Sequence, residues 1–167
     1  MSELIRFMPY DDDNRSAYPD ISEYLPGALD VIHIRQGTYK MGLRANRFVS
    51  PNFAACSGFI LRDESQANFG FLHALPTQDL YEYDFEHLKE LAGGQFIVVE
   101  GSSSTSKIWI VRDFQRKLGM KQVDTITVDT IRPKVGNMHF HVSFRPQSNE
   151  LLVVRRSHED LLVYKVF

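Results

Sequence analysis

Short apolar runs of strand length dominate the chain from residue 29 onward. Alternation over residues 31–35 predicts a strand, and Gly37 predicts a turn before a second short strand. Residues 57–63 (SGFILRD) and 69–75 (FGFLHAL) flank the polar stretch 63–68, a pattern that predicts a β-hairpin. Pro51 and Asn52 are strand breakers, so residues 48–55 are predicted to form a loop.

Two segments have helical spacing instead. Residues 84–92 place three apolar side chains on one face and end at Gly93-Gly94. Residues 105–118 place four on one face, namely Ile108, Val111, Phe114 and Leu118, and are followed by Gly119. Further β-rich runs, separated by Pro, Gly, Asn and Ser, predict strands over residues 95–100, 123–129, 138–144, 151–155 and 161–166.

These elements predict an α+β domain of layered, mostly antiparallel, sandwich-like sheets with about two flanking helices. Residues 1–28 differ from the rest, because three prolines and the run Asp11-Asp12-Asp13 interrupt any regular pattern. We therefore expect an irregular N-terminal arm over residues 1–28 and a single domain over residues 29–167.

Composition narrows the functional classes. The 167 residues carry 19 Lys and Arg against 21 Asp and Glu, a net charge of −2, which does not indicate a nucleic-acid partner or an anionic membrane surface. No apolar run approaches the roughly 20 residues of a membrane helix, and no signal peptide is recognised. We expect a protein synthesised in the cytoplasm, and secretion or translocation into a host cell as an effector stays open.

The single cysteine, Cys56, excludes an internal disulfide and a multi-cysteine zinc site. If residues 57–63 and 69–75 pair, Cys56 and His73 lie near the open end of the hairpin, where a histidine can serve a cysteine nucleophile as its base. A buried structural cysteine is the alternative interpretation. His139 and His141 alternate on one strand but have no evident third ligand, so we expect neither a metal nor an organic cofactor.

The stretch SPNFAACSGFILRDESQANFGFLHALP, residues 50–76, resembles the chemoreceptor glutamine deamidases of the CheD family. Cys56 matches the family's nucleophile, Gly70-Phe71-Leu72-His73 matches its histidine segment, and Ser50 falls where the family has a hydroxyl residue. A looser likeness extends over roughly residues 30–157. Bacterial toxins similar to cytotoxic necrotizing factors use the same Cys–His core. The chain departs from the family in having Phe53-Ala54-Ala55 before the cysteine.

The resemblance implies a CheD-like fold and deamidation of a protein glutamine through a thioester on Cys56. His73 is expected to hold the thiolate as an ion pair and to protonate ammonia, and Ser50 to orient the imidazole. Ala55, Ser57 and Gly58 are expected to line the oxyanion hole and the substrate approach. The substrate is expected to be a receptor or, for an effector or toxin, a host protein. Transglutaminase, small-molecule thiol amidase and non-catalytic protein-binding module stay open as alternatives.

Overall fold

The protein was studied as a computed structural model, which describes residues 2–8, 30–53, 55–76, 85–101, 107–128, 131–132, 136–137, 140–155 and 160–167. Its strands are β1 (Glu3–Met8), β2 (Val31–His33), β3 (Thr38–Leu43), β4 (Arg47–Phe53), β5 (Ser57–Arg62), β6 (Asn68–Ala74), β7 (Gln95–Gly101), β8 (Lys121–Val128), β9 (Ile131–Arg132), β10 (Gly136–Asn137), β11 (Phe140–Arg145), β12 (Glu150–Arg155) and β13 (Asp160–Lys165). Its helical segments are α1 (Phe85–Leu88), a 3₁₀ turn (Lys89–Leu91) and α2 (Lys107–Leu118).

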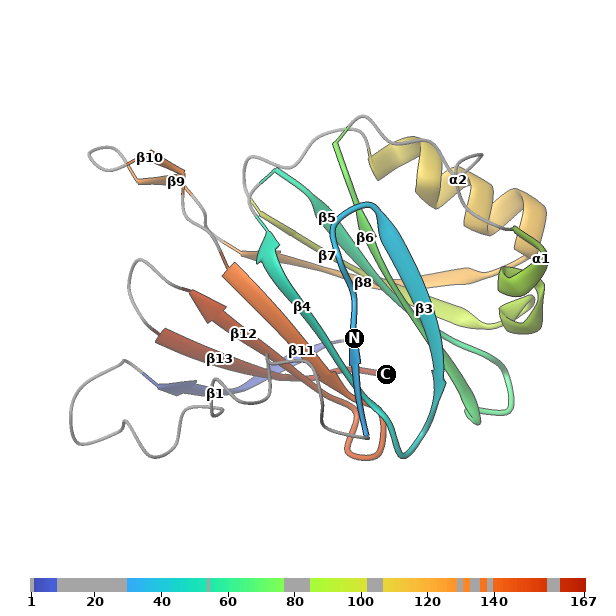
Figure 1. The fold of residues 1–167 in the computed structure, drawn as a ribbon, viewed down its shortest axis with the longest axis horizontal. Coiled ribbons are helices and arrows are strands. Elements are labelled where there is room, and N and C mark those ends of the chain that lie inside the picture. Colours follow the sequence, from blue (N-terminus) through green and yellow to red (C-terminus); the bar gives the residue numbers. More distant parts are fainter. Residues whose placement is uncertain are drawn as a thin grey trace.

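Two large sheets form the body of the molecule (Figure 1). The six-stranded sheet has the order β1-β13-β12-β11-β4-β2, and the five-stranded sheet has the order β3-β6-β5-β7-β8. Among the described strands, only the pairs β2–β4 and β7–β8 are parallel, so the expectation of mostly antiparallel pairing is confirmed. The parallel pair β7–β8 is joined through α2, as a parallel connection requires a crossover.

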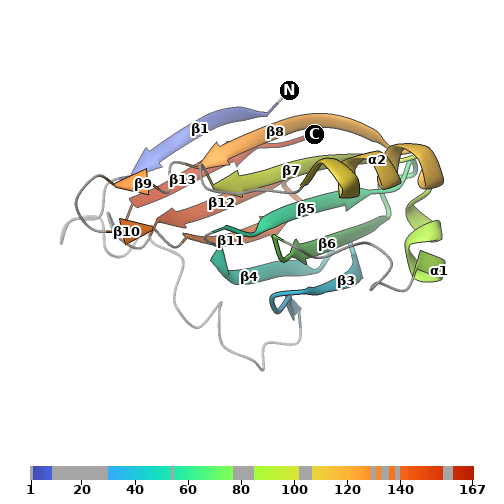
Figure 2. The same cartoon turned by 90° about the horizontal axis from the view of Figure 1, so that it is seen from above.

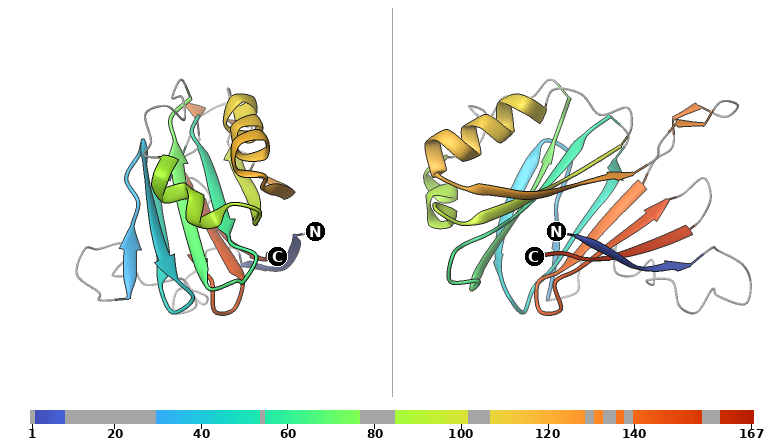
Figure 3. Two further views of the ribbon diagram at one scale, coloured as in Figure 1. Left: turned by 90° about the vertical axis from the view of Figure 1, so that its right-hand side faces the viewer. Right: turned by 180° about the vertical axis from the view of Figure 1, so that it is seen from behind.

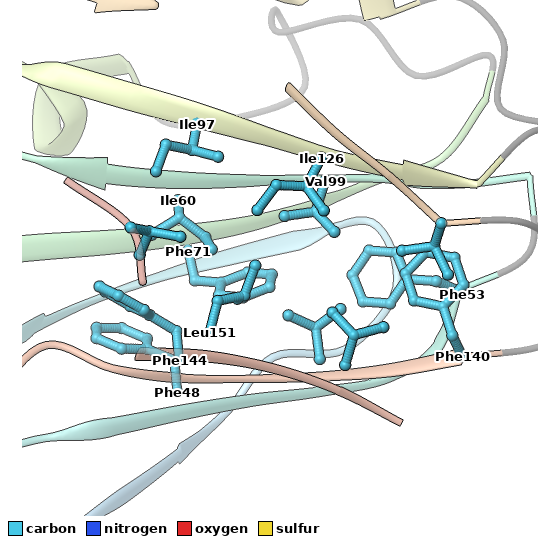
Figure 4. Close-up of a cluster of buried hydrophobic side chains, with 14 of the residues drawn as sticks. Phe48, Phe53, Ile60, Phe71, Ile97, Val99, Ile126, Phe140, Phe144 and Leu151 are labelled. Carbon is cyan, nitrogen blue, oxygen red and sulfur yellow. The ribbon is translucent and has the colours of Figure 1, made fainter. Parts of the chain in front are cut away.

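The sheets and helices form layers, as the sequence predicts. Helix α2 lies along the outer face of the five-stranded sheet, on the side away from the six-stranded sheet (Figures 2 and 3). One apolar cluster lies between the sheets and includes Phe48, Phe71 and Phe144 (Figure 4). A second cluster lies beneath the helices and includes Phe59, Phe96 and Phe114. Alternation along β5 explains the division, because Ile60 faces one cluster while Phe59 and Leu61 face the other.

The hairpin that carries the candidate site is confirmed. Strands β5 and β6 pair antiparallel with Ser57 opposite Ala74 and Gly58 opposite His73. The turn is held by Asp63, whose carboxylate accepts hydrogen bonds from the Ser65 hydroxyl and from the Asn68 amide, each at 2.8 Å. Both strands are central in their sheet, since β3 and β7 flank them.

Two expectations from the sequence are wrong. Residues 3–8 of the expected irregular arm form β1, which pairs with β13 and brings the two ends of the chain side by side (Figure 3), because Glu3 lies opposite Lys165. The rest of that arm lies outside the described residues. The expected loop over residues 48–55 is largely strand β4, and Pro51 fits there because the register with β11 shifts between Phe140 and Val142.

The helix expected over residues 84–92 is also shorter than predicted. It consists of one α-helical turn and a 3₁₀ turn. Helix α2, in contrast, ends where the sequence predicts, at Leu118, and Gly119 follows with a φ of 62°, a conformation that glycine adopts without steric cost.

Candidate active site

His73 lies on the central strand β6 and is fully buried. By the alternation of β6 it shares the inner face of the sheet with Phe71, a member of the cluster between the two sheets. A polar ring in such a place needs partners for its nitrogens, because an unsatisfied buried group costs about 1–3 kcal/mol. The hydrogen bonds of the imidazole therefore define what this site can do.

A hydrogen-bond chain links the imidazole to strand β4 and to the backbone after β2. The Ser50 hydroxyl lies 2.7 Å from Nδ1 of His73 and 2.9 Å from the carbonyl oxygen of Ile34. A carbonyl only accepts, so the single hydroxyl proton of Ser50 is donated to Ile34. Ser50 must then accept from His73, which places the ring proton on Nδ1 and leaves a lone pair on Nε2. This is the tautomer that a general base requires.

Phe53 covers one face of the imidazole. The two rings are parallel to within 7° and their centroids are 3.7 Å apart. Gly58 makes room for this stack, since a Cβ at that position would lie 3.2 Å from Cε1 of Phe53. Phe140 stacks on Phe53 in turn, at 5.1 Å (Figure 4). The imidazole is thus held between hydrogen-bonded and aromatic neighbours.

Burial lowers the pKa of His73 from 6.5 to about 3, because the charged imidazolium loses its hydration in the apolar interior. At neutral pH the ring is therefore uncharged. The expected resting ion pair between imidazolium and thiolate does not fit this environment. A neutral base that accepts the thiol proton during the reaction does fit.

Cys56 lies directly before β5 and is 6% exposed. Extending the β5–β6 register by one residue sets position 56 opposite Leu75, diagonal to His73. The cysteine belongs to the cluster between the sheets, which is the face that His73 also occupies. In the described part of the chain Nε2 has no hydrogen-bond partner, so the Cys56 thiol does not donate to it in this conformation. Thiol and base thus share a face without touching.

The three residues expected to line the substrate approach have different surroundings. Ala55 is half-buried and precedes the strand. The Ser57 side chain, by the alternation of β5, faces the helix side of the sheet, away from His73. Gly58 pairs with β6 and β7 beneath the Phe53 ring, and its lack of a side chain leaves room for that ring.

Sequence reasoning missed Ile34 and Phe53 as parts of the site. Ile34 acts through its carbonyl oxygen, which no side-chain pattern reveals. Phe53 falls in the stretch that the sequence predicts to be a loop, so no pattern indicates its approach to His73. Within the described residues, no three His, Cys, Asp or Glu side chains gather in a way that could hold a metal ion.

Comparison with known protein families finds no matching family, and comparison with characterised proteins finds no match. The resemblance to the glutamine deamidases therefore rests on residues 50–76. None of the helices in the described ranges is long and apolar enough to cross a membrane.

Proposed function

We propose that this protein is a cysteine-dependent glutamine deamidase that acts on a protein side chain. The observation that carries the proposal is the Ser50–His73 hydrogen bond, which leaves the lone pair of Nε2 open on the face that Cys56 shares. An oriented base beside a single buried thiol is the minimum that nucleophilic attack on a carboxamide requires.

The proposed reaction starts from neutral groups. As Sγ of Cys56 attacks the carboxamide carbon, Nε2 of His73 takes the thiol proton and the carbonyl oxygen becomes an oxyanion. His73 then returns the proton to the leaving nitrogen. The C–N bond breaks, ammonia departs, and a thioester on Cys56 remains. A water molecule then gives a proton to Nε2 as its oxygen attacks the thioester carbon, the C–S bond breaks, and Nε2 returns the proton to Sγ. The products are a glutamate side chain and the regenerated thiol, and Ser50 holds the ring orientation throughout.

The low pKa of His73 fits a transient proton carrier. Because the imidazolium is disfavoured by burial, it forms only while negative charge develops on sulfur and oxygen beside it. Because Nε2 has no hydrogen-bond partner in this structure, Sγ of Cys56 has to move toward it when substrate enters. Backbone N–H groups near Cys56 are the candidates for stabilising the oxyanion, a contribution of about 3–4 kcal/mol per donor in comparable enzymes.

A second candidate is a non-catalytic binding module with the same fold. The absence of a Cys56–Nε2 hydrogen bond, together with the low exposure of Cys56, favours it. In that case the Ser50–His73 hydrogen bond only provides a partner for a ring nitrogen of a buried histidine.

Intact-mass analysis separates these candidates. Purified protein is incubated with candidate substrate proteins, and peptide mapping locates any Gln-to-Glu change of about one dalton. The deamidase proposal expects this change with wild type and not with Cys56→Ser or His73→Ala. Amine incorporation would indicate a transglutaminase, hydrolysis of small amides alone would indicate a small-molecule amidase, and a stable complex with unchanged mass would indicate a binding module.

A further inference from the structure

The most exposed large apolar side chains of the described residues include two neighbours on α2. Trp109 is 65% exposed and Ile108 is 58% exposed. Neither is needed for the packing of the helix, because Ile110, Phe114 and Leu118 already fill its buried face. Scattered single apolar residues are ordinary on a protein surface, but an adjacent tryptophan and isoleucine on a helix offer an anchor for another molecule.

Cationic side chains continue this face of α2. The guanidinium of Arg112 lies 5.3 Å from the centre of the Trp109 ring, and Arg116 follows one helical turn later. The acidic residue of α2, Asp113, pairs with Lys117 at 3.2 Å. No carboxylate in the described ranges lies within ion-pair distance of Arg112 or Arg116. The face therefore combines an apolar anchor with two positive charges that a partner can neutralise.

The position of this face relates it to the candidate active site. The N-terminal end of α2 lies beside the end of β6 (Figures 1 and 2). Leu75, which is 38% exposed, follows that strand, and Ala74 pairs with Ser57, the residue after Cys56. The first turn of α2, which contains Trp109, and the start of β5, which Cys56 precedes, therefore lie toward the same end of the five-stranded sheet, with α2 on its outer face and Cys56 on its inner face.

We infer that the exposed face of α2, formed by Ile108, Trp109, Arg112 and Arg116, docks an acidic segment of the protein substrate. The inference rests on the proposed function for the identity of the partner, whereas the acidic chemistry of the segment follows from the surface itself. An apolar side chain of the segment would pack on Trp109 and its carboxylates would meet Arg112 and Arg116. Substrate selection would then reside on α2, outside the buried Cys–His site.

The chain's single tryptophan makes this surface directly observable, because all tryptophan emission comes from Trp109. The probe is a synthetic peptide of about fifteen residues, with a central glutamine, one leucine and glutamates on both sides. Its counterpart has lysines in place of the glutamates. Both are titrated into Cys56→Ser protein at low salt, so that turnover does not change the peptide. We expect a saturable blue shift of the emission with the acidic peptide only, weakened by added salt.

A second experiment reverses the two positive charges on α2. Arg112→Glu with Arg116→Glu should weaken binding of the acidic peptide at least fivefold. The matched control, Lys40→Glu with Arg44→Glu, changes the net charge equally at exposed positions on β3 and in the turn after it, and should retain binding. The inference is overturned if the emission does not move, if both peptides bind equally, or if both double variants lose binding to the same degree.

Mass analysis of the peptides with wild-type protein keeps the two proposals distinct. Selective binding of the acidic peptide without deamidation would support the docking surface and argue against the proposed deamidase activity. Deamidation that is equally efficient in the Arg112→Glu/Arg116→Glu variant would retain the deamidase and reject the docking surface.

Discussion

Burial of His73 makes the stability of the protein sensitive to mild acid. In the unfolded chain this histidine has a pKa near 6.5, whereas burial lowers the pKa to about 3 in the folded protein. The unfolded state therefore binds a proton between these values that the folded state excludes. Protonation favours unfolding, so this contribution to stability is present at neutral pH and is lost as the pH falls from 6.5 toward 3.

The size of the effect follows from the slope of about 1.4 kcal/mol per pH unit for one proton. Between pH 7 and pH 4.5 the free energy of unfolding should fall by about 2–3 kcal/mol through His73 alone. Carboxylates also titrate in this interval, so the measurement is a comparison with His73→Gln, which removes the imidazole and retains a polar side chain.

Urea unfolding at pH 7.0, 5.5 and 4.5 provides the assay. The pH-dependent loss should be about 2–3 kcal/mol smaller in His73→Gln than in wild type. Equal pH dependence in wild type and His73→Gln would refute the reasoning. If His73→Gln does not fold, the imidazole titration of wild type by NMR replaces it, and a midpoint near 6.5 would be the contradicting result.

Three further changes test the surroundings of the imidazole. Ser50→Ala removes the acceptor of the buried Nδ1–H and should lower the free energy of unfolding by about 1–3 kcal/mol in a urea titration. Ser50→Thr retains a hydroxyl, so an equal loss in that variant would argue against the hydrogen bond as the cause. Gly58→Ala places a Cβ 3.2 Å from the Phe53 ring and should lower the free energy of unfolding by about 1–3 kcal/mol. It should also shift the NMR resonances of the His73 ring, and unchanged resonances would show that the stack does not depend on Gly58. Iodoacetamide should alkylate Cys56 more slowly than a free model thiol near neutral pH, because the side chain is only 6% exposed. The rate should fall further in His73→Ala, where no imidazole can accept the thiol proton, and equal rates in both proteins would exclude His73 as the base.

The sequence supported the parts of the fold that depend on local pattern. Two apolar runs on either side of a polar stretch predicted the β5–β6 hairpin, and the spacing of residues 105–118 predicted α2. The sequence did not predict the strands that depend on pairing with distant parts of the chain. Strand β4 contains Pro51, yet a register shift against β11 accommodates it, and residues 3–8 become a strand only because β13 offers an edge to pair with.

The sequence also predicted part of the candidate site. The pairing of β5 with β6 was enough to place Cys56 near His73, and the Ser50–His73 contact agrees with the spatial arrangement that the resemblance implies, although their catalytic roles stay predictions. The Phe53 stack could not be predicted, since it requires β4 to lie against the hairpin. The neutral state of His73 also depends on burial, which only the three-dimensional packing determines.

We propose that Cys56 and His73 convert a protein glutamine into glutamate. The most direct test is peptide mapping by mass spectrometry of candidate substrate proteins after incubation with wild type, Cys56→Ser and His73→Ala, combined with measurement of released ammonia. We expect a gain of about one dalton at a defined glutamine, with one ammonia per modified site, in the wild-type reaction only. A gain that persists in Cys56→Ser, or the absence of any modified glutamine when a stable complex forms, would contradict the proposal.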